Sequence, residues 1–340
     1  MTKVFNKYLM KFLWIVGIII LAFILFTCIQ LQTIQLPESM TGSPEVIDSI
    51  QQQDPQHFSF ILMGDTKSGT ATMENLLEIT AQETPAFVVI LGDFASKATP
   101  YAHRFFAMEA QEYASRIPIL VIPGNHDVDT DGPFTLTDFE SLYGPANKSF
   151  RIDGYLFILL NNLDDYNKDG QYIDFLENTI QSQETVPEHI FVFMHIPPAG
   201  LNAPIMAGEL IQSERFLETV QKYHVDYVFC GDHHGYVKTK FNGVNFIISG
   251  GGGANLRGTQ GHFHHAVRIA VNGDEIDETV IAVKRKIETL EMLEQNIANY
   301  IWAPFMEHPF LSSGILIVII YFLFIHSHRQ KIVTSLKKTP

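Results

Sequence analysis

Five short apolar runs in this 340-residue chain each end in a side chain that can bind a metal ion. The most distinctive run, at residues 117–123, leads into Gly-Asn-His-Asp at 124–127, and the other four end at Asp65, Asp93, His195 and Asp232. Short apolar runs of this kind predict buried strands, and α/β proteins bind their ligands at the carboxyl ends of such strands. Carboxylate, amide and imidazole groups gathered at one sheet edge are typical of a metal site.

The segments between these runs favour a layered α/β fold. Apolar residues recur at helical intervals in 72–83 and 101–116, so the first part of the body reads as strand, helix, strand, helix, strand. That order predicts parallel strands joined by right-handed crossovers. After residue 235 the pattern changes to short strands, and Asn242-Gly243 and Asn272-Gly273 predict hairpin turns between them. The body is therefore predicted to hold two packed, mixed sheets with helices outside.

Taken in order, the motifs closely resemble those of the calcineurin-like metallophosphoesterases over residues 58–281: Gly-Asp, Gly-Asp, Gly-Asn-His-Asp, His and Gly-His-x-His. The resemblance implies a four-layer α/β/β/α sandwich of two mixed sheets. It also implies a metal-dependent hydrolase of phosphomonoesters or phosphodiesters, which acts by in-line attack of a metal-bound hydroxide without a covalent enzyme intermediate. The implied cofactors are two divalent metal ions, Mn, Fe or Zn, with Mn favoured.

The resemblance also implies a role for each motif residue. Six are implied metal ligands: Asp93 as the bridge, Asp65 and His234 on the first metal, and Asn125, His195 and Asp232 on the second. Two are implied catalytic residues. His126 faces the leaving group as an acid or hydrogen-bond donor, and Asp127 orients His126 from behind.

Two positions depart from the family pattern. Lys67 stands where the first motif often has a metal-binding His, and a protonated lysine is a poor ligand. Either the first metal has fewer protein ligands and more water, or Lys67 contacts the substrate phosphate. Asp232 replaces the first His of the last motif, so a shifted register that uses His233 is an alternative. We therefore expect Lys67 and His233 to be the candidate substrate-binding residues.

These departures keep other interpretations open. One is a catalytically degenerate, membrane-anchored protein that binds or senses a phosphorylated ligand. Another is a membrane scaffold that binds a protein partner through the helix expected at 284–300. The glycine run at 249–255 is either a phosphate-binding loop or an ordinary loop. His262, His264 and His265 are either a metal cluster or residues at the rim of the site.

Both ends of the chain carry apolar runs. Residues 12–29 are long enough to cross a bilayer, and residues 310–325 form a second, slightly shorter run. Basic residues precede the first run and follow the second, so the positive-inside rule predicts that both ends are cytoplasmic and the body lies across the membrane. A cleaved signal peptide is the alternative for the first run, although no small-residue cleavage site follows it.

The expected organisation has six parts. They are a transmembrane anchor at 1–30, a linker at 31–57, the phosphoesterase domain at 58–283, an amphipathic connecting helix at 284–303, a transmembrane helix at 304–326 and a basic cytoplasmic tail at 327–340. The expected location is a bacterial inner membrane, with the catalytic domain on the periplasmic or outer side. The formal net charge of −14 argues against nucleic acid as a partner. The expected partners are a phosphoester substrate and the membrane.

Overall fold

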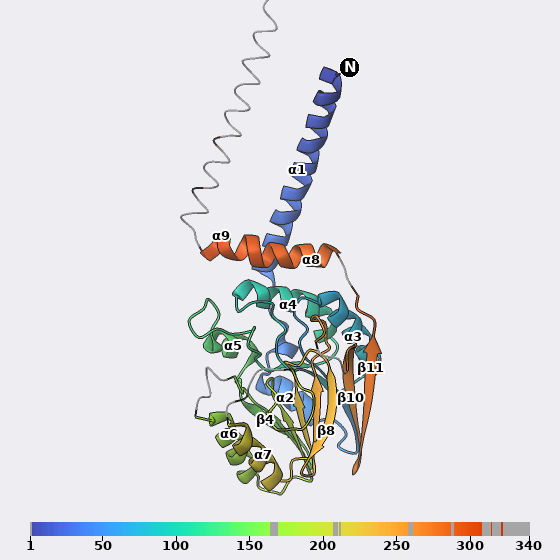
Figure 1. The fold of residues 1–340 in the computed structure, drawn as a ribbon, viewed down its shortest axis with the longest axis vertical. Coiled ribbons are helices and arrows are strands. Elements are labelled where there is room, and N and C mark those ends of the chain that lie inside the picture. Colours follow the sequence, from blue (N-terminus) through green and yellow to red (C-terminus); the bar gives the residue numbers. More distant parts are fainter. Residues whose placement is uncertain are drawn as a thin grey trace, which may run out of the picture.

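Two mixed β-sheets lie at the centre of the computed structural model, which describes residues 2–163, 169–206, 210, 212–257, 261–286, 289–307, 314 and 321 (Figure 1). The first sheet has the strand order β11-β10-β1-β2-β3. Its strands are β1 (His57–Met63), β2 (Phe87–Ile90), β3 (Ile119–Val121), β10 (His264–Asn272) and β11 (Glu275–Val283). In the parallel part, Met63 pairs with Ile90 and Ile90 with Val121. The carboxyl ends of β1, β2 and β3 are therefore level at one edge of the sheet.

The second sheet has the strand order β4-β5-β6-β7-β9-β8. Its strands are β4 (Lys148–Ile152), β5 (Tyr155–Leu159), β6 (His189–Phe193), β7 (Tyr227–Cys230), β8 (Tyr236–Phe241) and β9 (Val244–Ser249). β5, β6 and β7 are parallel, and Leu159, Phe193 and Phe229 pair across their ends. The two mixed sheets and the hairpin at Asn242-Gly243 confirm the predicted α/β class.

Phenylalanines fill the space between the two sheets. Phe60 of β1 stacks on Phe87 of β2 with 5.2 Å between ring centroids. It also meets four rings of the second sheet edge to face: Phe157, Phe191, Phe193 and Phe229. Ile61 and Met63 belong to a different core that contains the outer helices. Alternate residues of β1 thus serve two cores, as a strand buried on both faces requires.

Helices lie on the outer faces of the sheets (Figure 1). They are α3 (Thr70–Gln82), α4 (Pro100–Ala114), α5 (Leu136–Tyr143), α6 (Gln171–Gln181) and α7 (Ser213–Lys222). Thr99 caps the start of α4, where Pro100 occupies the first turn. Leu76 of α3 and Phe106 of α4 are buried in the same core as Ile61. This packing fixes the loops between strands and helices, which carry the candidate site.

One helix among the described residues is long and apolar enough to cross a membrane. This is α1 (Thr2–Thr33), with an apolar stretch at Ile15–Thr33. Its length and composition suit either an anchor or a signal sequence. The second transmembrane helix was expected at 304–326, and all of it except 304–307, 314 and 321 lies outside the described residues. The basic tail expected at 327–340 lies outside them as well.

The segment expected to be a linker is folded onto the body. It contains a 3-10 turn, η1 (Glu38–Met40), and α2 (Pro44–Gln51), whose amino end is capped by the Ser43 side chain. Met40 and Ile50 are fully buried, and Ile50 belongs to the core between the sheets. The linker interpretation is therefore corrected for these residues. Val46 and Ile50 lie one helical turn apart, and burying them outweighs the polar composition of the segment.

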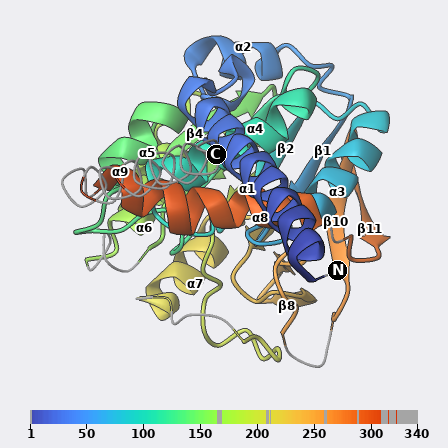
Figure 2. The same ribbon diagram turned by 90° about the horizontal axis from the view of Figure 1, so that it is seen from above.

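A helical segment late in the described chain runs across the top of the body, beneath α1 (Figures 1 and 2). It comprises α8 (Thr289–Asn296), the π-helical turn η3 (Ile297–Trp302) and α9 (Ala303–Glu307), and we call it the crossing helix. Ala298 packs with Leu31 of α1 and Phe105 of α4. The crossing helix occupies the place where an amphipathic helix was expected at 284–303, but it extends to Glu307.

Candidate metal centre

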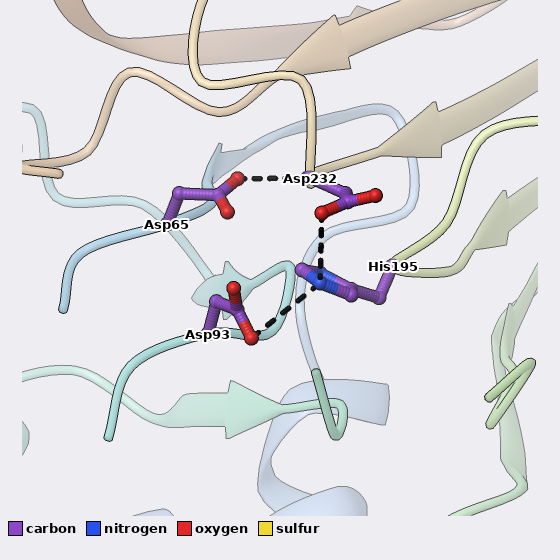
Figure 3. A group of neighbouring side chains, drawn as sticks. All are labelled: Asp65, Asp93, His195 and Asp232. Carbon is purple, nitrogen blue, oxygen red and sulfur yellow. Dashed lines mark hydrogen bonds and ion pairs between the residues drawn. The ribbon is translucent and has the colours of Figure 1, made fainter. Parts of the chain in front are cut away.

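The loops after β1, β2, β6 and β7 bring four side chains to one place (Figure 3). Ligand atoms of Asp65, Asp93, His195 and Asp232 all lie within 4.8 Å of one another, and all four residues are buried. His195 Nε2 is 3.5 Å from Asp93 Oδ1 and 3.9 Å from Asp232 Oδ1. The backbone N–H of Asp232 donates to Asp65 Oδ2 at 2.8 Å. Both sheets contribute strands, so this cluster depends on the packing of one sheet against the other.

Two further predicted ligands adjoin the cluster. Asn125, which follows β3, places Oδ1 at 3.2 Å from His195 Nε2. His234 places Nε2 at 3.2 Å from Asp65 Oδ1. All six side chains that were expected to bind metal therefore form one connected group at the carboxyl edge of the parallel strands.

Backbone carbonyl groups orient both histidines. Nδ1 of His195 lies 2.7 Å from the Leu91 carbonyl oxygen, and Nδ1 of His234 lies 2.8 Å from that of Asn255. Each Nδ1 therefore carries a proton and donates it, so that Nε2 is the atom that faces the carboxylates. Metal-binding histidines are commonly held in this way, by a hydrogen bond from the nitrogen that does not bind the metal.

The buried carboxylates of the cluster favour positive charge beside them. Burial acts to lower the pKa of His195, but Asp93, Asp65 and Asp232 outweigh burial and raise that pKa to about 9. Burial acts to raise the pKa of Asp93, but His195 and Lys67 lower it to about 2. At Asp65 burial dominates and raises the pKa. A proton on His195 thus balances the carboxylates, and a divalent cation would replace that proton because both bind at Nε2.

Two buried polar atoms test whether the site fits a cation. Asp65 Oδ1 and His234 Nε2 have no hydrogen-bond partner among the residues that the structure describes. With its Nδ1 proton donated to the Asn255 carbonyl, a neutral His234 would turn an unprotonated Nε2 toward Asp65 Oδ1, 3.2 Å away. Such an arrangement is unfavourable unless positive charge lies between the two atoms. Carboxylate and amide oxygens together with imidazole nitrogens therefore fit a divalent cation.

Four of the six residues have a left-handed backbone. The φ angles of Asp65, Asp93, Asp232 and His234 are 56°, 57°, 59° and 53°. Few residues other than glycine adopt this region, and Asp, Asn and His are the ones that enter it most readily. Each such residue costs about 1–3 kcal/mol and persists only where the surrounding structure enforces it, often at a functional site. The left-handed backbone at these strand ends therefore favours Asp and His, which are also residue types that can bind a metal ion.

Gly92 lies close to both the His195 ring and the Gly124 backbone. Its φ is +80°, and a Cβ atom there would lie 2.6 Å from His195 Nδ1 and 2.9 Å from the Gly124 backbone. We expect Gly92→Ala to displace His195 and to lower the free energy of unfolding by about 3 kcal/mol, through left-handed strain and overlap together.

Gly243→Ala is the matched control for this prediction. Gly243 has a φ of +94°, but a Cβ atom there would meet no atom within 4 Å. We expect this variant to lose only about 1–2 kcal/mol, from backbone strain alone. Chemical denaturation and metal analysis of both variants provide the measurement. Equal losses of stability, with unchanged metal content in Gly92→Ala, would contradict the predicted crowding of His195.

Asp127 has a role different from the one expected. We expected it to orient His126, but its buried carboxylate accepts hydrogen bonds from the backbone N–H groups of Asp93, Phe94, Ala95 and Gly124. These donors belong to the loops after β2 and β3. Asp127 therefore fixes the two loops that carry Asp93 and Asn125 relative to each other. Burial raises the pKa of Asp127 to about 7, with Asp93 adding to the effect.

A pocket of about 500 Å³ lies beside the cluster. Its lining residues are Ser96, Lys97, Ala98, Thr99, Asn125, His126, Val128, Asp129 and Pro133. His126 is exposed, and its backbone N–H donates to Asp93 Oδ1 at 2.9 Å. Burial of part of its ring lowers the pKa of His126, which favours a neutral imidazole that can donate or accept a hydrogen bond. The volume of about 500 Å³ makes the pocket large enough for a phosphate group with a small substituent.

Lys67 contacts the cluster through Asp93. Its Nζ forms an ion pair with Asp93 Oδ2, and its backbone N–H donates to the Asp93 carbonyl at 2.9 Å. The residue is 8% exposed. The Lys67 ammonium group therefore competes with a metal ion for the Asp93 carboxylate, which was expected to bridge two metals.

The remaining candidates lie around the cluster. His233 is buried and its Nδ1 accepts a hydrogen bond from the Met206 backbone, so it braces a loop. Backbone N–H groups of Gly252 and Ala254 in the glycine run donate to the Gly64 and Asp65 carbonyls. The run thus holds the loop that carries Asp65. His264 and His265 bind backbone carbonyls of Gly251 and Phe263, and His262 is exposed.

The sequence motifs did not identify two asparagines, Asn162 and Asn255, that hold the site histidines. Asn162 accepts hydrogen bonds at Oδ1 from the backbone N–H groups of His195 and Ile196, and its Nδ2 donates to the Ile196 carbonyl. Asn255 supplies the carbonyl that holds His234. Asn162 closely follows the apolar run of β5, so the strand-end signal that identified Asn125 was present there too.

A family model described as calcineurin-like phosphoesterase matches residues 58–236. Among curated proteins, the chain is similar to the bovine (Bos taurus) protein named serine/threonine-protein phosphatase CPPED1. The two are 26% identical over 254 residues, which cover 65% of this chain and 79% of the bovine protein. The match places all of the predicted metal ligands inside the family segment.

Two solved structures have similar folds. One is a dimetal phosphatase from Danio rerio, with a TM-score of 0.51, 14% identity, and coverage of 68% of this chain and 100% of that one. The other is the purple acid phosphatase PPD1 from yellow lupin (Lupinus luteus), with a TM-score of 0.50, 17% identity and coverage of 72% of this chain. This chain spans only 56% of the lupin chain. Because the family model covers more than half of the 340 residues, the protein belongs to the calcineurin-like phosphoesterase family.

Proposed function

We propose that this protein is a metal-dependent hydrolase of phosphomonoesters or phosphodiesters. The observation that carries the proposal is the buried group of Asp65, Asp93, His195 and Asp232, whose ligand atoms lie within 4.8 Å of one another. Family membership supports the reaction class, because the matched family is one of phosphoesterases. The expected displacement at phosphorus is in line and forms no covalent enzyme intermediate.

The proposed cofactors are two divalent cations, with Mn as the first choice and Fe or Zn as alternatives. Asp93 would be shared, and the other ligands would be Asp65 and His234 on one side and Asn125, His195 and Asp232 on the other. Bound there, the cations would neutralise the phosphoryl oxygens and lower the pKa of a water molecule.

The chain itself supplies orientation and proton transfer. His126 lines the pocket, so we propose that it donates a hydrogen bond or a proton to the leaving-group oxygen. Asp127 keeps the His126 loop and the Asp93 loop in register through four backbone hydrogen bonds. Lys67, held against Asp93, is proposed to keep positive charge near the phosphate.

We also propose that α1 remains attached and anchors the protein in a membrane. Its last turns are packed on the body: Thr27, Cys28 and Leu31 are buried, and Arg104 Nη1 donates to the Leu31 carbonyl at 3.3 Å. Removing α1 would expose these contacts. The basic residues before α1 favour a cytoplasmic amino end. The proposed location is a bacterial inner membrane with the body on the outer side.

The Lys67–Asp93 ion pair favours one alternative function. With an ammonium group on the central carboxylate, the protein could bind a phosphorylated ligand without cleaving it. Lys67 would then take the place of a cation, and the two ends of the chain would relay the binding event across the membrane.

Hydrolysis of p-nitrophenyl phosphate and its bis ester by the full-length protein in detergent tests the two functions. We expect turnover with Mn, loss of about 100-fold or more on chelation, and recovery when Mn is added back. Metal content is measured on the same samples. Absence of turnover with Mn, Fe and Zn, together with saturable binding of a phosphorylated ligand, would establish the alternative instead.

A further inference from the structure

The crossing helix exposes several large apolar side chains. Tyr300 is 63% exposed, Leu293 48% and Ile301 47%, whereas Ile297 and Ala303 are buried. Leu290, Met292 and Phe305 add to the exposed set. An apolar face of this kind on a short helix marks a surface that is covered by a partner or a bilayer.

The position of α1 indicates what covers this face. Leu31, near the end of α1, packs on Ala298 of the crossing helix. Ile29 and Phe26, closely preceding it, are 61% and 58% exposed. At 1.5 Å per residue, the exposed apolar part of α1 begins roughly 3–8 Å above the level of Leu31. If α1 enters a bilayer, the crossing helix therefore lies at the surface of that bilayer and across the axis of α1 (Figure 1).

The side chains of the crossing helix suit the headgroup layer. Trp302 stacks on Phe305 with 5.8 Å between ring centroids, and Lys97 Nζ lies 4.0 Å from the ring centroid of Tyr300. Aromatic rings and lysines are typical of the boundary between hydrocarbon and water. Glu291 and Glu294 also belong to this helix, so apolar and aromatic area rather than net charge would hold it at the membrane.

The same helix is joined to the rim of the catalytic pocket. Asn299 Nδ2 donates to Ser96 Oγ at 2.6 Å, and Tyr300 lies against Lys97. Ser96 and Lys97 line the pocket together with His126. Thus the crossing helix is in direct contact with two residues that line the pocket.

A second contact joins the chain just before the crossing helix to the metal centre. Arg285 Nη1 donates to Asn255 Oδ1 at 2.7 Å, and the Asn255 carbonyl holds His234. The crossing helix and the segment that leads into it are therefore connected to both sides of the site. A phosphoester at the membrane surface would lie close to Ser96 and Lys97, which line the pocket.

We propose that the crossing helix lies in the headgroup layer of the bilayer that α1 enters, and that the substrate is a phosphoester headgroup of a membrane lipid. This inference rests on the proposed hydrolase function and names its substrate class. A pocket of about 500 Å³ takes a headgroup while the acyl chains stay in the bilayer. A lipid substrate need not leave the membrane, so the crossing helix sets the pocket at the height of the phosphate.

The reaction is hydrolysis and needs water as its only co-reactant. The oxygen of water forms a new bond to phosphorus, and the bond from phosphorus to the leaving oxygen breaks. The leaving oxygen takes up a proton, for which His126 is the proposed donor, and the attacking water loses one. A lipid phosphomonoester yields a lipid alcohol and inorganic phosphate, and a lipid phosphodiester yields a phosphomonoester and an alcohol.

The test uses the full-length protein in phosphatidylcholine nanodiscs with Mn. Phosphatidic acid in the disc is compared with free glycerol 3-phosphate, and phosphatidylglycerol with free glycerophosphoglycerol, so each pair shares one phosphoester. We expect at least one lipid to be cleaved about ten-fold faster than its soluble partner at equal bulk concentration. Equal or slower cleavage of both lipids would overturn the substrate class.

Variants separate membrane docking from catalysis. The double variant Leu293→Glu/Ile301→Glu is expected to lower lipid cleavage about ten-fold and to leave p-nitrophenyl phosphate cleavage within about two-fold. Val186→Glu is the control, because Val186 is 90% exposed and precedes the amino end of β6, at the opposite edge of the sheet. Both rates should be unchanged in this control. If the double variant cleaves lipid at the wild-type rate, the crossing helix does not dock on the bilayer.

A physical readout checks docking without any reaction. In a Trp14→Phe background, Trp302 is the remaining tryptophan of the chain. Brominated phosphatidylcholine should quench its fluorescence in the wild-type crossing helix and less so in the double variant. Equal quenching of Trp302 in the wild type and in the double variant would contradict docking of this helix on the bilayer. Loss of p-nitrophenyl phosphate cleavage in all proteins would instead refute the hydrolase function itself.

Discussion

Replacing His195 with alanine is expected to lower kcat/KM for p-nitrophenyl phosphate by about 1,000-fold, or about 4 kcal/mol of transition-state stabilisation. His195 Nε2 faces Asn125, Asp93 and Asp232 at 3.2, 3.5 and 3.9 Å, so it is the ring around which the cluster is assembled. Alanine removes a ligand and leaves the carboxylates without their nearest imidazole. Metal content should fall together with activity.

His189→Ala is the matched control, because His189 and His195 lie at opposite ends of the same strand. His189 starts β6, places Nδ1 3.3 Å from Asp226 Oδ1 and stacks on Tyr155. Its replacement should cost some stability but leave activity within about two-fold, because His189 lies at the amino end of β6 and touches none of the cluster residues. Circular dichroism establishes that both variants are folded. Wild-type activity and metal content in folded His195→Ala would remove His195 from the site.

The strand ends of the site were predictable because one physical constraint acts on both sequence and structure. A buried strand must be apolar, and ligand-binding polar side chains can follow where the strand ends at the edge of the sheet. Asp65, Asp93 and Asp232 follow this rule, and each enters a left-handed conformation that Asp tolerates. The same rule applied to Asn162 would have revealed the residue that holds the backbone of His195.

Other parts depended on contacts that the sequence does not show. Asp127 follows His126 in the chain, yet its carboxylate turns to backbone amides of two loops, and only the folded geometry reveals this. The segment at 38–51 is polar on average, but two or three apolar side chains suffice to fold it onto the body. Lys67 forms its ion pair with Asp93, and this too depends on how loops distant in the sequence are placed relative to each other.

The same ion pair leads to a second large effect, in which stability and metal binding change in opposite directions. Lys67→Met keeps the length of the side chain but removes the charge that compensates Asp93. Removing one partner of a buried pair leaves an uncompensated charge, so we expect the metal-free protein to lose about 3–5 kcal/mol of unfolding free energy. Because the ammonium competes with a cation for the same carboxylate, Mn should bind more tightly to the variant.

Denaturation in the presence of a chelator and calorimetric titration with Mn measure these two effects. Lys148→Met is the matched control: Lys148 is also buried, and its Nζ donates to the Tyr143 carbonyl at 2.8 Å, away from the cluster. It should lose stability with and without Mn alike and bind Mn like the wild type. In Lys67→Met the stability loss should shrink once Mn is bound, because the cation then compensates Asp93 in place of the ammonium. Weaker Mn binding in Lys67→Met would instead mean that Lys67 supports the metal site rather than competing with it.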